Sequence, residues 1–199
     1  MNIFLSWSGT RSNLVAKAFQ RCLPLLFDGL DIYLSTSMNK GVRWSDKLNA
    51  ALQKSDFAIL CVTRENRAAP WMMYEAGVLS QTTSKNVAPF LLDMSASELK
   101  NPVTQFQITV FEKEDLETLI LTINQCRAEK ERVPEATLKR RFQLVYNSSL
   151  EKLLQEALDT QDGEEDIARK TLAGVEQLLD ISKQTLLKDI TSDRTKRLG

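Results

Sequence analysis

The sequence of 199 residues contains no histidine, only three cysteines and no excess of either charge. Without histidine there is no Ser-His-Asp triad, no Cys-His dyad and no histidine-ligated zinc, so any catalysis must use carboxylates, lysine, tyrosine, serine or cysteine. The 26 basic and 26 acidic residues balance to a net charge of zero. This balance argues against a dedicated nucleic-acid-binding protein, because such proteins usually carry a basic face.

The three cysteines, Cys22, Cys61 and Cys126, stand apart in apolar or helical surroundings. Their spacing matches neither a disulfide framework nor a metal knuckle, so we expect a reducing compartment and no metal. No run of about 18 apolar residues is present, and the apolar run at the N-terminus is short and lacks a basic leader. We therefore expect a soluble, cytoplasmic protein with no membrane partner and no nucleic-acid partner.

Short apolar runs alternate with helical patterns through the first two thirds of the chain, which is typical of a parallel sheet covered on both faces. The runs predict five strands, at Asn2–Ser6, Leu30–Leu34, Phe57–Val62, Val87–Leu92 and Gln107–Phe111. Apolar residues at helical spacing predict helices at Ser12–Phe27, Trp44–Lys54, Pro70–Thr83 and Asp115–Arg127. This order indicates a flavodoxin-like, doubly wound α/β domain, in which ligands bind beyond the carboxyl ends of the strands.

The strand signal stops after Lys130, and we divide the chain into a strand-and-helix domain over 1–127 and a helical extension over 128–199 that packs on it or mediates oligomerisation. In the extension, Pro134 opens a helix that is interrupted near Asn147–Ser149. A further helix carries apolar residues at heptad-like spacing: Leu172, Val175, Leu179 and Leu186. Two interpretations stay open, namely helices that pack on their own domain and an arm for oligomerisation.

Glu75 is the residue whose surroundings most strongly indicate a functional site. On the helix predicted over 70–83, its neighbours one turn away on both sides are all apolar: Trp71, Met72, Val78 and Leu79. A carboxylate on such an inward face must find hydrogen-bond donors, shift its pKa upward or face a cleft. The residues alone leave a catalytic role and a structural role open, the latter with Glu75 held by a helix N-terminus or a buried arginine.

Two polar segments follow the first two predicted strands. The turn over residues 6–10 leads into a helix, where backbone N–H groups can hold a phosphate, although a plain helix cap explains it equally well. The loop over residues 35–43 carries Lys40, Gly41 and Arg43. The charges of Lys40 and Arg43 can contact phosphates or an acidic surface, or they can simply be solvated. Neither a dinucleotide-binding glycine fingerprint nor a P-loop is present.

In their order and spacing, these segments resemble a Toll/interleukin-1 receptor (TIR) domain, in particular the stand-alone prokaryotic kind. The resemblance covers about residues 1–127, and we therefore predict a TIR domain over this range. It is carried by Ser6-Trp7-Ser8-Gly9, Lys40-Gly41-x-x-Trp44, Ser55-Asp56-Phe57 and Asn66-x-x-x-Pro70-Trp71-x-x-x-Glu75-x-Gly77.

Many members of the TIR family cleave NAD⁺ at the nicotinamide–ribose bond and share a glutamate on the third helix, which Glu75 matches. The resemblance implies that Glu75 binds the ribose hydroxyls and stabilises the oxocarbenium-like charge as nicotinamide leaves. It implies NAD⁺ as a substrate, with no cofactor, and suggests that Trp71 stacks on a ring. It also implies that Ser6, Trp7 and Ser8 line the nucleotide cleft, and that the loop with Lys40, Gly41 and Arg43 gates this cleft or packs against another copy.

Prokaryotic relatives often serve in anti-phage defence, either by exhausting NAD⁺ or by converting it to a cyclic ADP-ribose signal. The expected partners are therefore NAD⁺, further copies of the chain, and a downstream effector that reads a nucleotide signal. Two alternative functions are a non-catalytic TIR scaffold and a nucleoside deoxyribosyltransferase-like enzyme with a covalent glutamate nucleophile. The apolar surroundings of Glu75 favour an enzyme, because a scaffold has no need to bury a carboxylate there.

Overall fold

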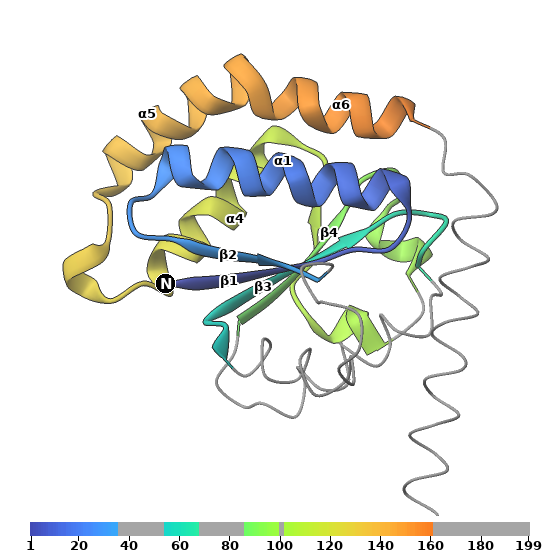
Figure 1. Ribbon diagram of the computed structural model, residues 1–199, viewed down its shortest axis with the longest axis horizontal. Coiled ribbons are helices and arrows are strands. Elements are labelled where there is room, and N and C mark those ends of the chain that lie inside the picture. The colour runs from blue at the N-terminus through green and yellow to red at the C-terminus, as the bar shows by residue number, and fades with distance from the viewer. Residues whose placement is uncertain (36–53, 68–85, 100–101, 161–199) are drawn as a thin grey trace, which may run out of the picture.

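The computed structural model describes residues 1–35, 54–67, 86–99 and 102–160. In these ranges the chain forms a parallel sheet of five strands in the order β2-β1-β3-β4-β5 (Figure 1). The strands are β1 (Asn2–Ser6), β2 (Asp31–Leu34), β3 (Phe57–Val62), β4 (Asn86–Leu91) and β5 (Thr109–Val110). This winding outward from β1 in both directions confirms the predicted flavodoxin-like α/β fold.

The described α-helices cover one face of the sheet. They are α1 (Thr10–Leu26), α4 (Lys113–Gln125), α5 (Glu135–Val145) and α6 (Glu151–Asp159). Alternate strand residues such as Leu5, Ile59 and Phe90 pack under these helices, whereas Phe4 and Leu60 face the opposite side. Each central strand thus buries both of its faces, which explains why its sequence is a continuous apolar run.

The predicted bounds of β1 and β3 are confirmed, and those of β2 and β4 are within one residue at either end. The prediction for β5 was too long, because this edge strand pairs only Thr109 and Val110 with β4. Helix α1 begins two residues earlier than predicted, after Gly9, whose φ of 93° turns the chain into the helix. Apart from Lys54, the predicted helices at 44–54 and 70–83 lie outside the described residues.

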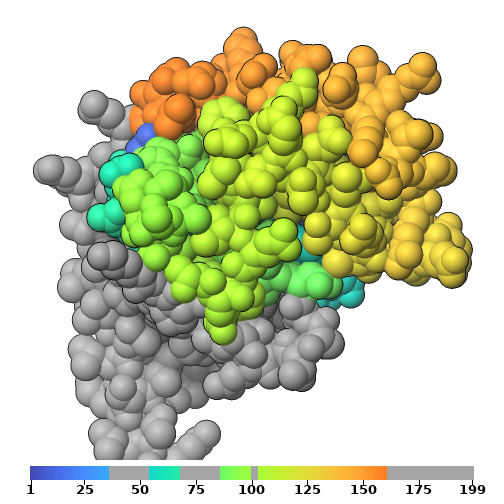
Figure 2. Space-filling model, turned by 180° about the vertical axis from the view of Figure 1, so that it is seen from behind, coloured from blue at the N-terminus to red at the C-terminus, as the bar shows by residue number. Residues whose placement is uncertain are grey.

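The first part of the extension packs on the domain. Helices α5 and α6 run along α1 (Figure 1), and Leu138, Phe142 and Leu154 are fully buried in the same core cluster as Phe19 of α1. Figure 2 shows this layer from behind, with the extension along the top of the molecule above α4. The leucine-bearing segment after Thr160 lies outside the described residues, and the division at residue 127 stays a prediction.

The predicted interruption of the extension near residues 147–149 is a change of helix type and not a break. The chain remains helical through a π-helical turn at Tyr146–Leu150, which joins α5 to α6. The hydroxyl groups of Ser148 and Ser149 donate to the carbonyl O of Val145 at 3.4 and 3.1 Å. These hydroxyl groups donate hydrogen bonds to a backbone carbonyl within the helix. Helices α5 and α6 therefore follow α1 as one continuous layer.

Arg141 ties the extension to the C-terminal end of α1. Its Nη1 donates to the carbonyl O of Leu26 at 3.0 Å and lies 3.8 Å from Asp28 Oδ2. This contact is at the amino edge of the sheet, because β2 begins shortly after Asp28. No helix among the described residues is long and apolar enough to span a membrane.

Candidate functional site

The loops that follow β1, β3 and β4 meet at the carboxyl edge of the sheet. Ser6, Trp7 and Ser8, which the resemblance assigned to a nucleotide cleft, are all buried at the end of β1. The Trp7 side chain is part of the hydrophobic core cluster under α1. Trp7 therefore contributes to packing at this edge, and the cleft-lining role of the three residues stays a prediction.

Asn66 joins the β3 loop to the β1 loop. Its Nδ2 donates to the carbonyl O of Ser8 at 2.9 Å and to that of Cys61 at 3.1 Å, and its Oδ1 accepts the Thr63 N–H at 2.8 Å. The side chain is buried, with 3% of the residue exposed. These three hydrogen bonds fix the spacing of two neighbouring loops, because a buried amide has no water with which to replace its partners.

The β1 loop is also braced from α1. The Ser8 N–H donates to Ser12 Oγ at 2.9 Å, and the Ser12 hydroxyl donates in turn to the Ser8 carbonyl. The Ser8 amide is therefore engaged within the protein. The hypothesis that the turn over residues 6–10 holds a phosphate stays a prediction, and it concerns the backbone N–H groups of this turn other than that of Ser8.

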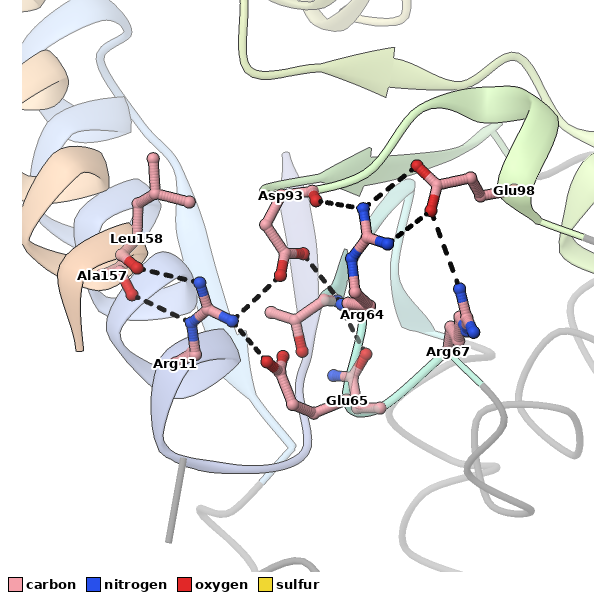
Figure 3. A network of polar contacts seen from close by, with 10 residues as sticks. Arg11, Arg64, Glu65, Arg67, Asp93, Glu98, Ala157 and Leu158 are labelled. Atoms are coloured by element: carbon pink, nitrogen blue, oxygen red, sulfur yellow. Dashed lines mark hydrogen bonds and ion pairs between the residues drawn. The ribbon is translucent and has the colours of Figure 1, made fainter. Parts of the chain in front are cut away.

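A network of charges centred on Arg11 connects this edge to the extension (Figure 3). Arg11 Nη1 lies 2.5 Å from Glu65 Oε1 and 2.9 Å from Asp93 Oδ2. Its Nη2 donates to the carbonyl O of Leu158 at 2.8 Å, and its Nε donates to that of Ala157 at 3.4 Å. The guanidinium thus contacts the loops after β3 and β4 and the C-terminal end of α6.

Arg64 and Glu98 form a second, more exposed group beside it (Figure 3). Arg64 Nη1 lies 2.8 Å from Glu98 Oε2, and the Arg64 backbone N–H donates to Asp93 Oδ1 at 2.8 Å. The Ser95 N–H, which donates to Glu98 Oε1 at 3.0 Å, and the nearby Arg64 lower the pKa of Glu98. Glu98 is therefore ionised at neutral pH and holds the β3 and β4 loops together.

Cysteine chemistry is disfavoured in this protein. None of the three cysteines forms a disulfide in the structure. Burial raises the pKa of the Cys22 and Cys126 thiols, which keeps them protonated and weakly nucleophilic at neutral pH. In the part of the chain that the structure describes, no group of three or more acidic, cysteine or histidine residues is placed to hold a metal ion.

The sequence interpretation did not identify Arg11 or Asp93. One signal for Arg11 was present, since an arginine in the first turn of a helix opposes the helix dipole unless anions lie nearby. The other predicted site residues, Glu75, Trp71, Lys40, Gly41 and Arg43, lie outside the described residues.

The sequence model of the TIR domain family matches residues 3–120, which is more than half of the chain. This chain belongs to the TIR domain family. The match ends within α4, so it spans the sheet and the loops of its carboxyl edge and leaves out the extension.

A solved structure of TIR domains is also similar to this chain. A TIR domain from the activated Roq1 resistosome, which recognises the pathogen effector XopQ, is 17% identical and aligns with a TM-score of 0.41. The alignment covers 79% of this chain and 96% of that domain. No curated protein matches the sequence.

Proposed function

We propose that this TIR domain cleaves NAD⁺ at the nicotinamide–ribose bond, with Glu75 as the catalytic residue. The observation that carries the proposal is the position of Asn66, the first residue of the family-like motif that contains Glu75 and ends at Gly77. Asn66 is hydrogen-bonded at the carboxyl edge to Ser8, in the segment that the resemblance assigns to the nucleotide cleft. The start of this motif therefore lies beside Ser8 at the edge where a flavodoxin-like sheet binds its ligands, which supports the proposal.

The chemistry needs little from the protein beyond charge and position. Nicotinamide in NAD⁺ is already a cationic leaving group, so no general acid is required when the C1′–N bond breaks. A carboxylate near C1′ stabilises the positive charge that develops on the ribose, and this effect is strong in a site from which water is excluded. Attack by water on C1′ gives ADP-ribose, and internal attack gives a cyclic ADP-ribose. A chain without histidine can perform either reaction.

The resemblance to prokaryotic TIR proteins extends the proposal to a biological role. In this role the protein acts in the cytoplasm in anti-phage immunity, either by depleting NAD⁺ or by producing a nucleotide signal for an effector. TIR–TIR contacts between copies of the chain would complete the cleft beside Lys40, Gly41 and Arg43. Trp71, one turn before Glu75 on the predicted helix, is proposed to stack on a ring of the substrate.

The deciding experiment is release of nicotinamide from NAD⁺ by the purified protein, compared with the Glu75→Gln variant. The amide keeps the shape of the side chain and removes its charge, so activity should fall by about 100-fold or more. Glu135→Gln is the matched control, because Glu135 is exposed on α5 and should leave activity unchanged.

Three results would count against the proposal. Full activity of Glu75→Gln would exclude Glu75 as the catalytic residue. An inactive wild type under every condition of concentration and crowding would favour the non-catalytic scaffold. A trapped glycosyl–enzyme intermediate on Glu75 would favour the deoxyribosyltransferase-like enzyme.

A further inference from the structure

Arg11 joins three segments that are distant in sequence. Glu65 and Asp93, which contact its Nη1, are 54 and 82 residues away, and Leu158, whose carbonyl accepts from Nη2, is 147 residues away. The side chain of Arg11 is 10% exposed. A guanidinium so buried is stable only when its donors are matched by acceptors, so this position depends on all three segments being in place.

The acceptors balance the charge from two sides. Arg11 lies in the first turn of α1, where the helix dipole disfavours a cation. The carboxylates of Glu65 and Asp93 offset that cost. The carbonyl groups of Ala157 and Leu158 belong to the last turn of α6, where the dipole of that helix favours a cation. If α6 leaves α1, the guanidinium loses this second set of acceptors.

One of the carboxylates that Arg11 contacts, that of Glu65, is part of the loop that leads toward Glu75, whereas Asp93 belongs to the loop after β4. Glu65 is adjacent to Asn66, which holds the β1 loop through Ser8. Asp93 uses its other oxygen to accept the Arg64 N–H at 2.8 Å. The backbone over residues 63–67 is thus held by Asn66 on one side and by the Arg11 carboxylates on the other.

We propose that Arg11 is a positioning residue, which couples the docking of α6 on α1 to the geometry of the 63–67 loop and thereby to the Glu75 site. The effect on activity rests on the proposed NAD⁺ cleavage. The coupling itself is a property of the fold and can be measured without substrate. In this mechanism, the first helices of the extension help to position the 63–67 loop, although they lie outside the residues that match the family.

The first test measures amide hydrogen exchange of residues 63–67 in the full chain, with Arg11→Met, Arg11→Lys and the control Arg141→Ala. Arg141 also ties the extension to α1, but at the opposite end of the helix. Arg11→Met should raise exchange of the Arg64 amide by about tenfold or more, since hydrogen bonds to charged groups are lost. Arg11→Lys keeps the charge but not the fork of donors, so its effect should be intermediate. Arg141→Ala should leave this loop unchanged.

The second test addresses coupling to the extension. Leu154→Ala removes a fully buried side chain from α6 and should loosen its docking. In the wild-type background it should raise exchange in residues 63–67, whereas in the Arg11→Met background it should add little. Additive effects in the two backgrounds would refute the coupling through Arg11, as would equal exchange in Arg11→Met and Arg141→Ala. If Arg11→Met does not fold, the same comparison is made with Arg11→Lys.

The third test concerns catalysis. In an active wild type, Arg11→Lys should lower kcat more than it raises KM, because Arg11 acts on the geometry of the 63–67 loop and does not itself bind the substrate. Unchanged kcat together with raised loop exchange would refute the link to the Glu75 site. An inactive wild type would contradict the proposed function, and the exchange measurements would still decide whether Arg11 positions the loop.

Discussion

Replacing Asn66 should destabilise the protein by disconnecting the two loops of the candidate site. In Asn66→Ala, the buried Thr63 N–H loses its acceptor and the carbonyl groups of Ser8 and Cys61 each lose a donor. A buried polar group left without its partner costs about 1–3 kcal/mol. The Ser8 carbonyl keeps the Ser12 hydroxyl as a donor, so we expect a total loss of about 2–4 kcal/mol in the free energy of unfolding.

Asn66→Asp tests the same hydrogen bonds with almost no change of shape. The introduced carboxylate still accepts the Thr63 N–H, but its second oxygen faces the carbonyl oxygens of Ser8 and Cys61 where the amide donated. At pH 7 this variant should be at least as destabilised as Asn66→Ala. Protonation of the carboxyl restores one donor, so its pKa in the folded state is raised above the unfolded value of about 3.9. The deficit should therefore shrink as the pH falls through the folded-state pKa.

The measurement is urea unfolding followed by circular dichroism at pH 7 and pH 5, with the m-value checked for changes in compactness. Asn124→Ala is a matched control, because Asn124 is also buried and exchanges two hydrogen bonds with Val133 at the amino edge. It should lower stability without affecting NAD⁺ cleavage, whereas Asn66→Ala should affect both. An Asn66→Asp protein that is as stable as the wild type at pH 7, or whose deficit does not change with pH, would refute this account.

Three further predictions concern the extension and the charges of the β4 loop. Leu154→Ala should lower the free energy of unfolding by about 2–5 kcal/mol, as for other buried leucines. Leu144→Ala should change it by less than about 0.5 kcal/mol, because Leu144 is 67% exposed. Thermal unfolding of the two variants compares these effects. Glu98→Gln should be less stable than the wild type at pH 7. This difference in stability should vanish as the pH falls below the lowered pKa of Glu98, because the stabilisation exists only while the carboxylate is ionised. Equal urea midpoints for the two proteins at pH 7 would contradict this prediction. Deletion of residues 162–199 should change the oligomeric state more than the fold, and identical masses in light scattering over a wide concentration range would exclude an oligomerisation arm.

The sequence by itself determined the sheet and the class of the fold. β1 and β3 were predicted with the bounds that the structure has because a central parallel strand is covered on both faces and its interior positions are therefore continuously apolar. β5 was predicted too long because an edge strand ends where its single neighbour stops pairing, which is a property of β4 and not of residues 107–111. The motif from Asn66 to Gly77, which contains Glu75, could also be recognised from the sequence, because its order and spacing are local features.

Only the tertiary structure decided which residues hold the candidate site together. The Asn66 amide contacts Ser8, 58 residues away, and the Arg11 guanidinium contacts Glu65, Asp93 and the end of α6. The position of Arg11 in the first turn of a helix indicates only that anions lie nearby. Which residues contact Arg11 and Asn66 is decided only when the strands pair and α6 packs on α1. Apolar periodicity determines which faces are buried, whereas a buried charge is stabilised by the particular donors and acceptors that folding places around it.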